Sequence, residues 1–172
     1  MFWHDTDYHF FDYKYNIPGY DHQDYDGPGR WIYLIGTLVL ITVLLILFRN
    51  ATKKQVKVYL IVVAIAMPVL EFSKVAWESY WDITTDRGFN VEGILPLYTC
   101  SLFMYCAIAA VFLKGKAQRY PLAWLSTIGI VGGMSNVLFI QGLRWYPFWT
   151  FGAFHSMTFH AVMVFTGLFI IT

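Results

Sequence analysis

Apolar runs of about 20 residues recur along this chain, and they constrain its fold more than any other feature. Such runs are long enough to cross the roughly 30 Å hydrocarbon core of a bilayer as helices. They cover about 31–48, 58–81, 94–113, 121–140 and 149–172. Only 13% of the residues are charged, about half the share of a soluble domain. We predict an all-α, polytopic integral membrane bundle of about five transmembrane helices, forming one domain over 31–172.

The loops between the runs predict an orientation. Loops 49–57 and 114–120 hold seven Lys and Arg residues (four and three), whereas loops 82–93 and 141–148 hold two. Basic loops stay on the cytoplasmic side, so the N-terminus is predicted outside in a multi-pass protein of the cell membrane. The net charge of +1 indicates no nucleic-acid partner. Membrane lipids are the expected partners.

Residues 1–30 are acidic and aromatic, with six Asp against Lys14 and Arg30, a net charge of −4. Histidines and aspartates at this density can bind zinc or calcium, but their spacing matches no known metal-binding loop. These residues are His4, Asp5, Asp7, His9, Asp12, Asp21, His22, Asp24 and Asp26. We predict an extracytoplasmic tail lying on the membrane surface, with no metal and no cofactor. No basic region precedes an apolar one, so no cleavable signal peptide is expected.

The second run contains three ionisable residues, Glu71, Lys74 and Glu78. Such residues cost about 2.5 kcal/mol or more at mid-bilayer and usually face a protein interior or a cavity. Spacings of three and four place them on one stripe of a helix. A carboxylate–ammonium–carboxylate triad is one interpretation, purely structural, and a substrate-binding stripe is the other.

The third run opens with Leu-Pro-Leu-Tyr-Thr-Cys at 95–100, with its proline in the first predicted turn. Cys100 is either a small buried hydrophobe or a nucleophile, which needs a nearby base. Cys106 lies six residues further on, on a different helix face, so no disulfide between the two is expected.

The fifth run supplies two candidate bases, His155 and His160. A spacing of five turns them about 140° apart on a helix, so we do not expect both to face one point. Ser156 and His160, four apart, share a face. The alternative role for each histidine is a hydrogen bond to a neighbouring helix.

The fourth run contains Gly129 and Gly133, a small-xxx-small pair typical of close helix packing. Asn136 follows, a buried amide that needs a hydrogen-bond partner.

With the predicted orientation, these polar residues fall in one layer, from about the midplane to 10 Å outside it. We therefore predict a polar cavity that opens towards the outer leaflet. It suits acyl transfer, with Cys100 attacking a carbonyl, His160 or His155 taking the proton, and Asn136 or Lys74 stabilising the oxyanion. It also suits the binding of a small zwitterion.

Three segments carry a family resemblance over roughly residues 30–172: the stretch 95–102, the Gly-rich stretch 129–136, and Phe-His-Ser-Met with Phe-His within 154–160. They resemble the YwaF-type bacterial membrane proteins, which are similar to the eukaryotic transmembrane-protein-164 group. The resemblance implies a multi-helix membrane fold. For the eukaryotic members it implies phospholipid acyl transfer by a cysteine nucleophile, carried here to Cys100, with His160 as the matching histidine and His155 second.

The sequence departs from the family pattern in two places. Tyr98 stands where the family usually has histidine. The family also usually has one or two more helices, and the sequence leaves open whether further helices follow Thr172.

Our functional prediction is a membrane-embedded acyltransferase or lipid-modifying enzyme with Cys100 as nucleophile. A non-catalytic subunit of a larger membrane complex, or a solute- or lipid-binding component, is the alternative. The predicted substrate-binding residues are Glu71, Lys74, Glu78, Tyr98 and Asn136.

Overall fold

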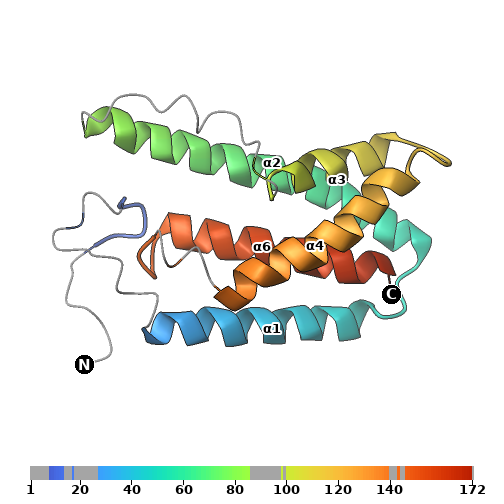
Figure 1. Ribbon diagram of the computed structural model, residues 1–172, viewed down its shortest axis with the longest axis horizontal. Coiled ribbons are helices and arrows are strands. Elements are labelled where there is room, and N and C mark those ends of the chain that lie inside the picture. The colour runs from blue at the N-terminus through green and yellow to red at the C-terminus, as the bar shows by residue number, and fades with distance from the viewer. Residues whose placement is uncertain are drawn as a thin grey trace.

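The computed structural model of the chain confirms the all-α membrane fold (Figure 1). It describes residues 8–13, 17, 27–85, 98, 100–139, 143 and 146–171. Within that part of the chain there are five α-helices and no strand. They are α1 (Pro28–Phe48), α2 (Lys53–Thr84), α3 (Leu102–Phe112), α4 (Arg119–Phe139) and α6 (Phe151–Ile171).

Four of the helices, α1, α2, α4 and α6, are long and apolar enough to cross a membrane. The third predicted run differs, because α3 has only 11 residues, about 16 Å at 1.5 Å per residue. A turn precedes it, in which the N–H of Phe103 donates to the carbonyl of Cys100. Cys100 therefore lies in a turn rather than inside a helix. Residues 94–97 of the predicted run lie outside the described residues.

Local sequence signals set the ends of the first two helices. Pro28 stands at the first position of α1, where its missing N–H costs nothing. Thr52 and Gln55 form a capping box that starts α2 five residues before the predicted run. At 32 residues, α2 is about 48 Å long and is therefore longer than the hydrocarbon core is thick. The helix continues beyond the apolar run that hydropathy alone predicts.

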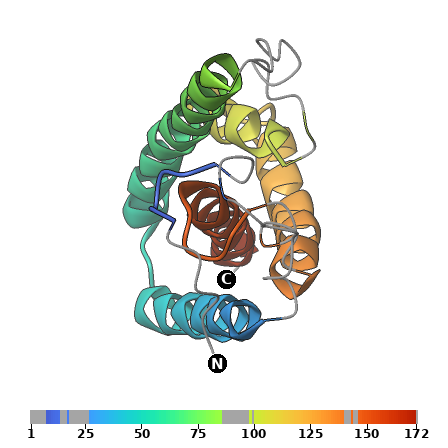
Figure 2. The ribbon, with the colours of Figure 1, turned by 90° about the vertical axis from the view of Figure 1, so that its left-hand side faces the viewer.

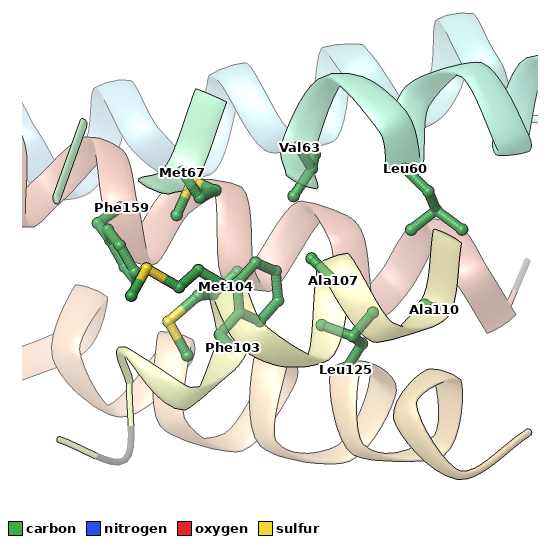
Figure 3. Packing of buried hydrophobic residues seen from close by; sticks show 10 residues of the cluster. Leu60, Val63, Met67, Phe103, Met104, Ala107, Ala110, Leu125 and Phe159 are labelled. Atoms are coloured by element: carbon green, nitrogen blue, oxygen red, sulfur yellow. The ribbon is translucent and has the colours of Figure 1, made fainter. Parts of the chain in front are cut away.

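Helix α6 occupies the centre of the bundle, surrounded by α1, α2, α3 and α4 (Figure 2). Twelve of its 21 residues are buried, whereas α1 has three buried residues among its 21. The hydrophobic core joins α6 to α2, α3 and α4, through side chains such as Met67, Phe103, Leu125 and Phe159 (Figure 3). Among the five described helices, α6 therefore has the largest share of buried residues.

Glycines bring α4 and α6 into backbone contact. A Cβ at Gly129 would lie 2.8 Å from the carbonyl oxygen of Met163, and one at Gly133 would lie 3.0 Å from that of His160. From the other side, a Cβ at Gly167 would lie 3.0 Å from the carbonyl oxygen of Ser126. The predicted close packing at Gly129 and Gly133 is confirmed, and it fixes how α6 is rotated.

Residues 8–13, which we call the N-terminal strap, cross the end of the bundle where α6 begins and α2 ends (Figure 2). We call this the outer end, following the predicted orientation. The carbonyl of Phe11 accepts the indole N–H groups of Trp77, at 2.7 Å, and Trp81, at 2.8 Å. The carbonyl of Phe10 accepts the N–H of Phe151 at 2.7 Å. The strap therefore ties α2 to α6.

Candidate functional site

A small polar cavity lies among α2, the turn before α3, and α6, towards the outer end. Its volume is about 90 Å³, which gives room for several water molecules. The residues around it are Glu71, Lys74, Tyr98, Cys100, Ser101, Tyr146, His155, Ser156, Phe159 and His160. Segments that are far apart in the sequence thus place a thiol, two imidazoles, a carboxylate and an ammonium group around one small space.

Glu71 joins three parts of the cavity wall. Its side chain is buried, and its Oε2 lies 3.2 Å from Nε2 of His155. Its Oε1 accepts a hydrogen bond from Ser101 Oγ at 3.2 Å. The His155 nitrogen is at ion-pair distance, although its N–H is not aligned for a hydrogen bond. A carboxylate buried inside a membrane bundle needs such partners, so Glu71 holds α2, α6 and the Cys100 turn together.

His160 is fixed by its own helix. Its Nδ1 lies 2.6 Å from the carbonyl oxygen of Ser156. A carbonyl can only accept, so Nδ1 carries the proton in the neutral ring and Nε2 is left as the proton acceptor. Ser156 and His160 do lie on one face of the helix, as predicted from their spacing, but their contact involves the backbone carbonyl of Ser156 rather than its hydroxyl.

Both histidines line the cavity, so our expectation that they do not face one point is wrong. The ring of Phe159 also lines the cavity and packs against both imidazoles, with centroid distances of 5.7 Å to His155 and 6.0 Å to His160. The 140° estimate describes Cα directions and ignores the length of the side chains.

Cys100 is half-buried at the cavity, and the thiol is free. Cys106 is also free. Both cysteines pack against the hydrophobic core, but Cys100 also lines the cavity whereas Cys106 does not. In the described part of the chain no hydrogen bond joins the sulfur of Cys100 to an imidazole. A proton passing from thiol to imidazole would therefore need a thiol rotation or a bridging water in the cavity.

The three ionisable residues of the second run do not form one triad. Glu71 lies beside His155, whereas Lys74 and Glu78 belong to a second cluster. Lys74 Nζ instead lies 3.4 Å from Glu78 Oε2, and Glu78 accepts a hydrogen bond from the Tyr146 hydroxyl. Tyr146 lies between α4 and α6, outside the spanning helices. Burial and the neighbouring Glu78 carboxylate raise the pKa of Tyr146 well above its usual value, so the phenol stays protonated and continues to donate.

Two of the predicted substrate-binding residues lie at the margin of the polar cavity or outside it. Tyr98 lines the cavity but is 63% exposed. Asn136, on α4, does not line it, and its buried Oδ1 finds no hydrogen-bond partner among the described residues. Ser101 and Tyr146 were missed by the sequence analysis. Ser101 had a signal, since it directly follows Cys100, whereas nothing in the sequence pattern singles out Tyr146.

The strap continues over the outer side of the cavity. Tyr13 is buried and packs its ring 5.2 Å from that of Trp77 and 6.5 Å from that of Tyr146. Asp12 accepts the backbone N–H of His9 at 2.7 Å, which closes a turn. The other predicted His and Asp residues of the tail lie outside the described residues.

Comparison with known proteins gives one match. The model of the TMEM164 family matches residues 22–172, a range that includes all five helices. No curated protein and no solved structure matches the chain.

Proposed function

This chain belongs to the TMEM164 family, and we propose that it is a membrane-embedded enzyme that moves acyl chains between lipids through a thioester on Cys100. The observation that supports this most is the cavity itself, where a free thiol, two imidazoles and a carboxylate share about 90 Å³. Nucleophile, base and a group that orients a base are the parts of a covalent acyl-transfer site.

In the first half-reaction, the thiol of Cys100 gives its proton to Nε2 of His160 and attacks the ester carbonyl of a donor phospholipid. The carbon–sulfur bond forms and the ester carbon–oxygen bond breaks. The leaving lysophospholipid oxygen takes the proton back from His160. The products are an S-acyl Cys100 and a lysophospholipid, and no other reactant is needed.

In the second half-reaction, Nε2 of His160 removes a proton from the hydroxyl of an acceptor lysophospholipid. That oxygen attacks the thioester carbonyl, the carbon–sulfur bond breaks, and the sulfur recovers the proton. Lys74 supports both steps, because an ammonium group at the cavity stabilises the oxyanion. Asn136, the other predicted donor, is not part of this proposal because it does not line the cavity.

The proposed role of Glu71 and His155 is to position the turn that carries Cys100. Ser101 donates to Glu71, and Glu71 lies beside His155 on the central helix. The cavity has room for an ester group but not for an acyl chain, so the chain would remain in the surrounding hydrocarbon. On the positive-inside orientation, the reaction takes place in the outer half of a cell membrane.

The test uses the two free cysteines as a matched pair. Purified protein is reconstituted in phosphatidylcholine vesicles with a labelled acyl chain, and unlabelled lysophosphatidylethanolamine is added. We expect labelled phosphatidylethanolamine, and a hydroxylamine-sensitive acyl adduct on the protein by mass spectrometry. Cys100→Ala should abolish both, whereas Cys106→Ala should keep both. His160→Gln should slow transfer by about 100-fold or more, the usual contribution of a general base.

An adduct that persists in Cys100→Ala would contradict the proposal, and so would transfer with no adduct in wild type. Absence of transfer and adduct in correctly folded wild type would leave a non-catalytic subunit or lipid-binding component as the better account of this cavity.

A further inference from the structure

A second hollow, much larger than the polar cavity, runs along the opposite face of α6. It is an apolar groove of about 430 Å³ between α1 and α2, with α6 as its floor. Its α6 residues include Phe154, Met157, Ala161 and Phe165, whereas those of the polar cavity are His155, Ser156, Phe159 and His160. At 100° per residue the two sets point roughly 160° apart, so the groove is a different site from the polar cavity.

The groove presents almost only carbon. Its polar residues are two threonines, Thr37 and Thr158, and two tyrosines, whose hydroxyls both have protein partners. Tyr33 donates to the carbonyl of Phe148 at 3.0 Å, and the hydroxyls of Tyr59 and Thr166 lie 2.6 Å apart. Met157 of the α6 floor and Met67 of the α2 wall are each 2% exposed. A ligand that fills this groove must therefore be mostly apolar.

The rim of the groove faces the bilayer. Leu40 of α1 is 54% exposed and Val62 of α2 is 55% exposed, and both belong to helices that can cross a membrane. At the inner end two lining side chains, Phe48 and Tyr59, both pack against Phe169. The open side is therefore lateral, where hydrocarbon chains of lipids are the surrounding solvent.

The length of the groove suits one acyl chain. It extends about 16 Å along α6, from Phe154 to Phe165, and about 22 Å along α1, from Tyr33 to Phe48. The length along α6 is close to the roughly 15 Å depth of one bilayer leaflet, which is the reach of one acyl chain.

We propose that this groove binds one acyl chain of a bilayer phospholipid, which packs between α1 and α2 and supports α1 against the bundle. The lipid is a resident ligand rather than the reacting substrate, because α6 separates the groove from Cys100. The proposal therefore goes beyond acyl transfer and does not depend on it.

Two alanines of α2 provide a matched test. Ala66 lines the groove and Ala76 does not, and both are exposed. Ala66→Phe and Ala76→Phe are made in the Cys100→Ala background, so that no acyl-enzyme can form. Each purified protein is mixed with palmitoyl-oleoyl phosphatidylcholine in detergent, and bound lipid is counted by native mass spectrometry. We expect one retained lipid in Cys100→Ala and in Ala76→Phe, and at least tenfold weaker retention in Ala66→Phe.

Equal retention in all three proteins, or an equal loss in both phenylalanine variants, would overturn the proposal. So would a dimer that Ala66→Phe dissociates, since the groove would then belong to a second copy of the chain. Loss of lipid in Ala66→Phe together with an inactive wild type would leave the lipid site standing and reject acyl transfer alone.

Discussion

Helices α1 and α6 have the same length and opposite positions in the molecule. Each has 21 residues and is apolar enough to span a membrane, yet α6 has twelve buried residues and α1 has three. The more apolar of the two, α1, is the one that faces lipid. Hydrophobicity brings both helices into the bilayer, but it does not decide which one enters the bundle.

The difference follows from how helices associate in lipid. Lipid tails are as apolar as leucine, so association depends on close backbone packing and on hydrogen bonds between helices. Helix α6 offers both, through Gly167 and through polar side chains such as His155 and Thr166 that reach α2. The hydroxyl of Thr42 on α1, in contrast, donates to the carbonyl of Leu38 in its own helix. Three matched pairs of substitutions and two double-mutant cycles test this account.

The largest effect is expected at the α4–α6 contact. A Cβ at Gly133 would lie 2.7 Å from Val164 Cγ2, so Gly133→Leu must push α4 and α6 apart. We expect a loss of about 3 kcal/mol in the free energy of unfolding, the upper part of the range for overpacking. Gly36→Leu on α1 meets nothing within 4 Å and should change stability by less than about 0.5 kcal/mol. Thermal or detergent-driven unfolding of the two variants measures this directly, and equal losses would remove glycine packing from the explanation.

The next effect concerns the polar tie between α2 and α6. A double-mutant cycle of Glu71→Gln and His155→Gln should give a coupling of about 1–2 kcal/mol, near the upper end for polar contacts in membrane bundles. The cycle of Lys74→Gln and Glu78→Gln, a pair with about a fifth of each side chain exposed, should give about 0.5 kcal/mol. A larger coupling for the exposed pair would mean that the Glu71–His155 contact does not hold α6 in place.

A smaller effect is expected from one hydroxyl. Thr166→Val removes the 2.6 Å contact with Tyr59 and leaves the tyrosine hydroxyl without its partner. We expect a loss of about 1 kcal/mol, within the range measured for hydrogen bonds between membrane helices. Thr42→Val on α1 removes only a bond within one helix and should be nearly neutral. Stabilities of the two valine variants that agree within error would argue against interhelical hydrogen bonds as a cause of the central position.

The sequence predicts the helices well where the bilayer sets their length. The predicted run 31–48 ends at the same residue as α1, because a spanning helix must match the thickness of the core. The prediction fails where local chemistry overrides hydropathy. A capping box at Thr52 starts α2 early, and a turn at Cys100 delays α3.

The candidate site shows a similar division. Periodicity and orientation place Glu71, Cys100 and His155 at one depth, since depth depends only on position along each helix. Pairing also depends on how the helices are rotated, and the rotation of α6 is fixed by its contacts with Gly129 and Gly133. The sequence alone therefore assigned Lys74 to Glu71 and could not find Tyr146.

The smallest effect is expected at the N-terminal strap, where a tryptophan that binds the strap, Trp81, is compared with a tryptophan of α1, Trp31. Trp81→Phe removes one of two indole N–H donors to the carbonyl of Phe11, and the other donor keeps that carbonyl bonded. We expect a loss of about 0.5 kcal/mol in the local stability of the strap rather than in the free energy of global unfolding, because the ends of a fold open before its core. Hydrogen exchange at the N–H of Phe151, which donates to Phe10, should become about twofold faster, since 0.5 kcal/mol corresponds to that factor at 25 °C.

Trp31→Phe on α1, where the ring is 57% exposed, should leave this exchange unchanged. Faster exchange in both variants would mean that the strap responds to any change in the interfacial aromatic residues, and that its link between α2 and α6 does not depend on these two hydrogen bonds.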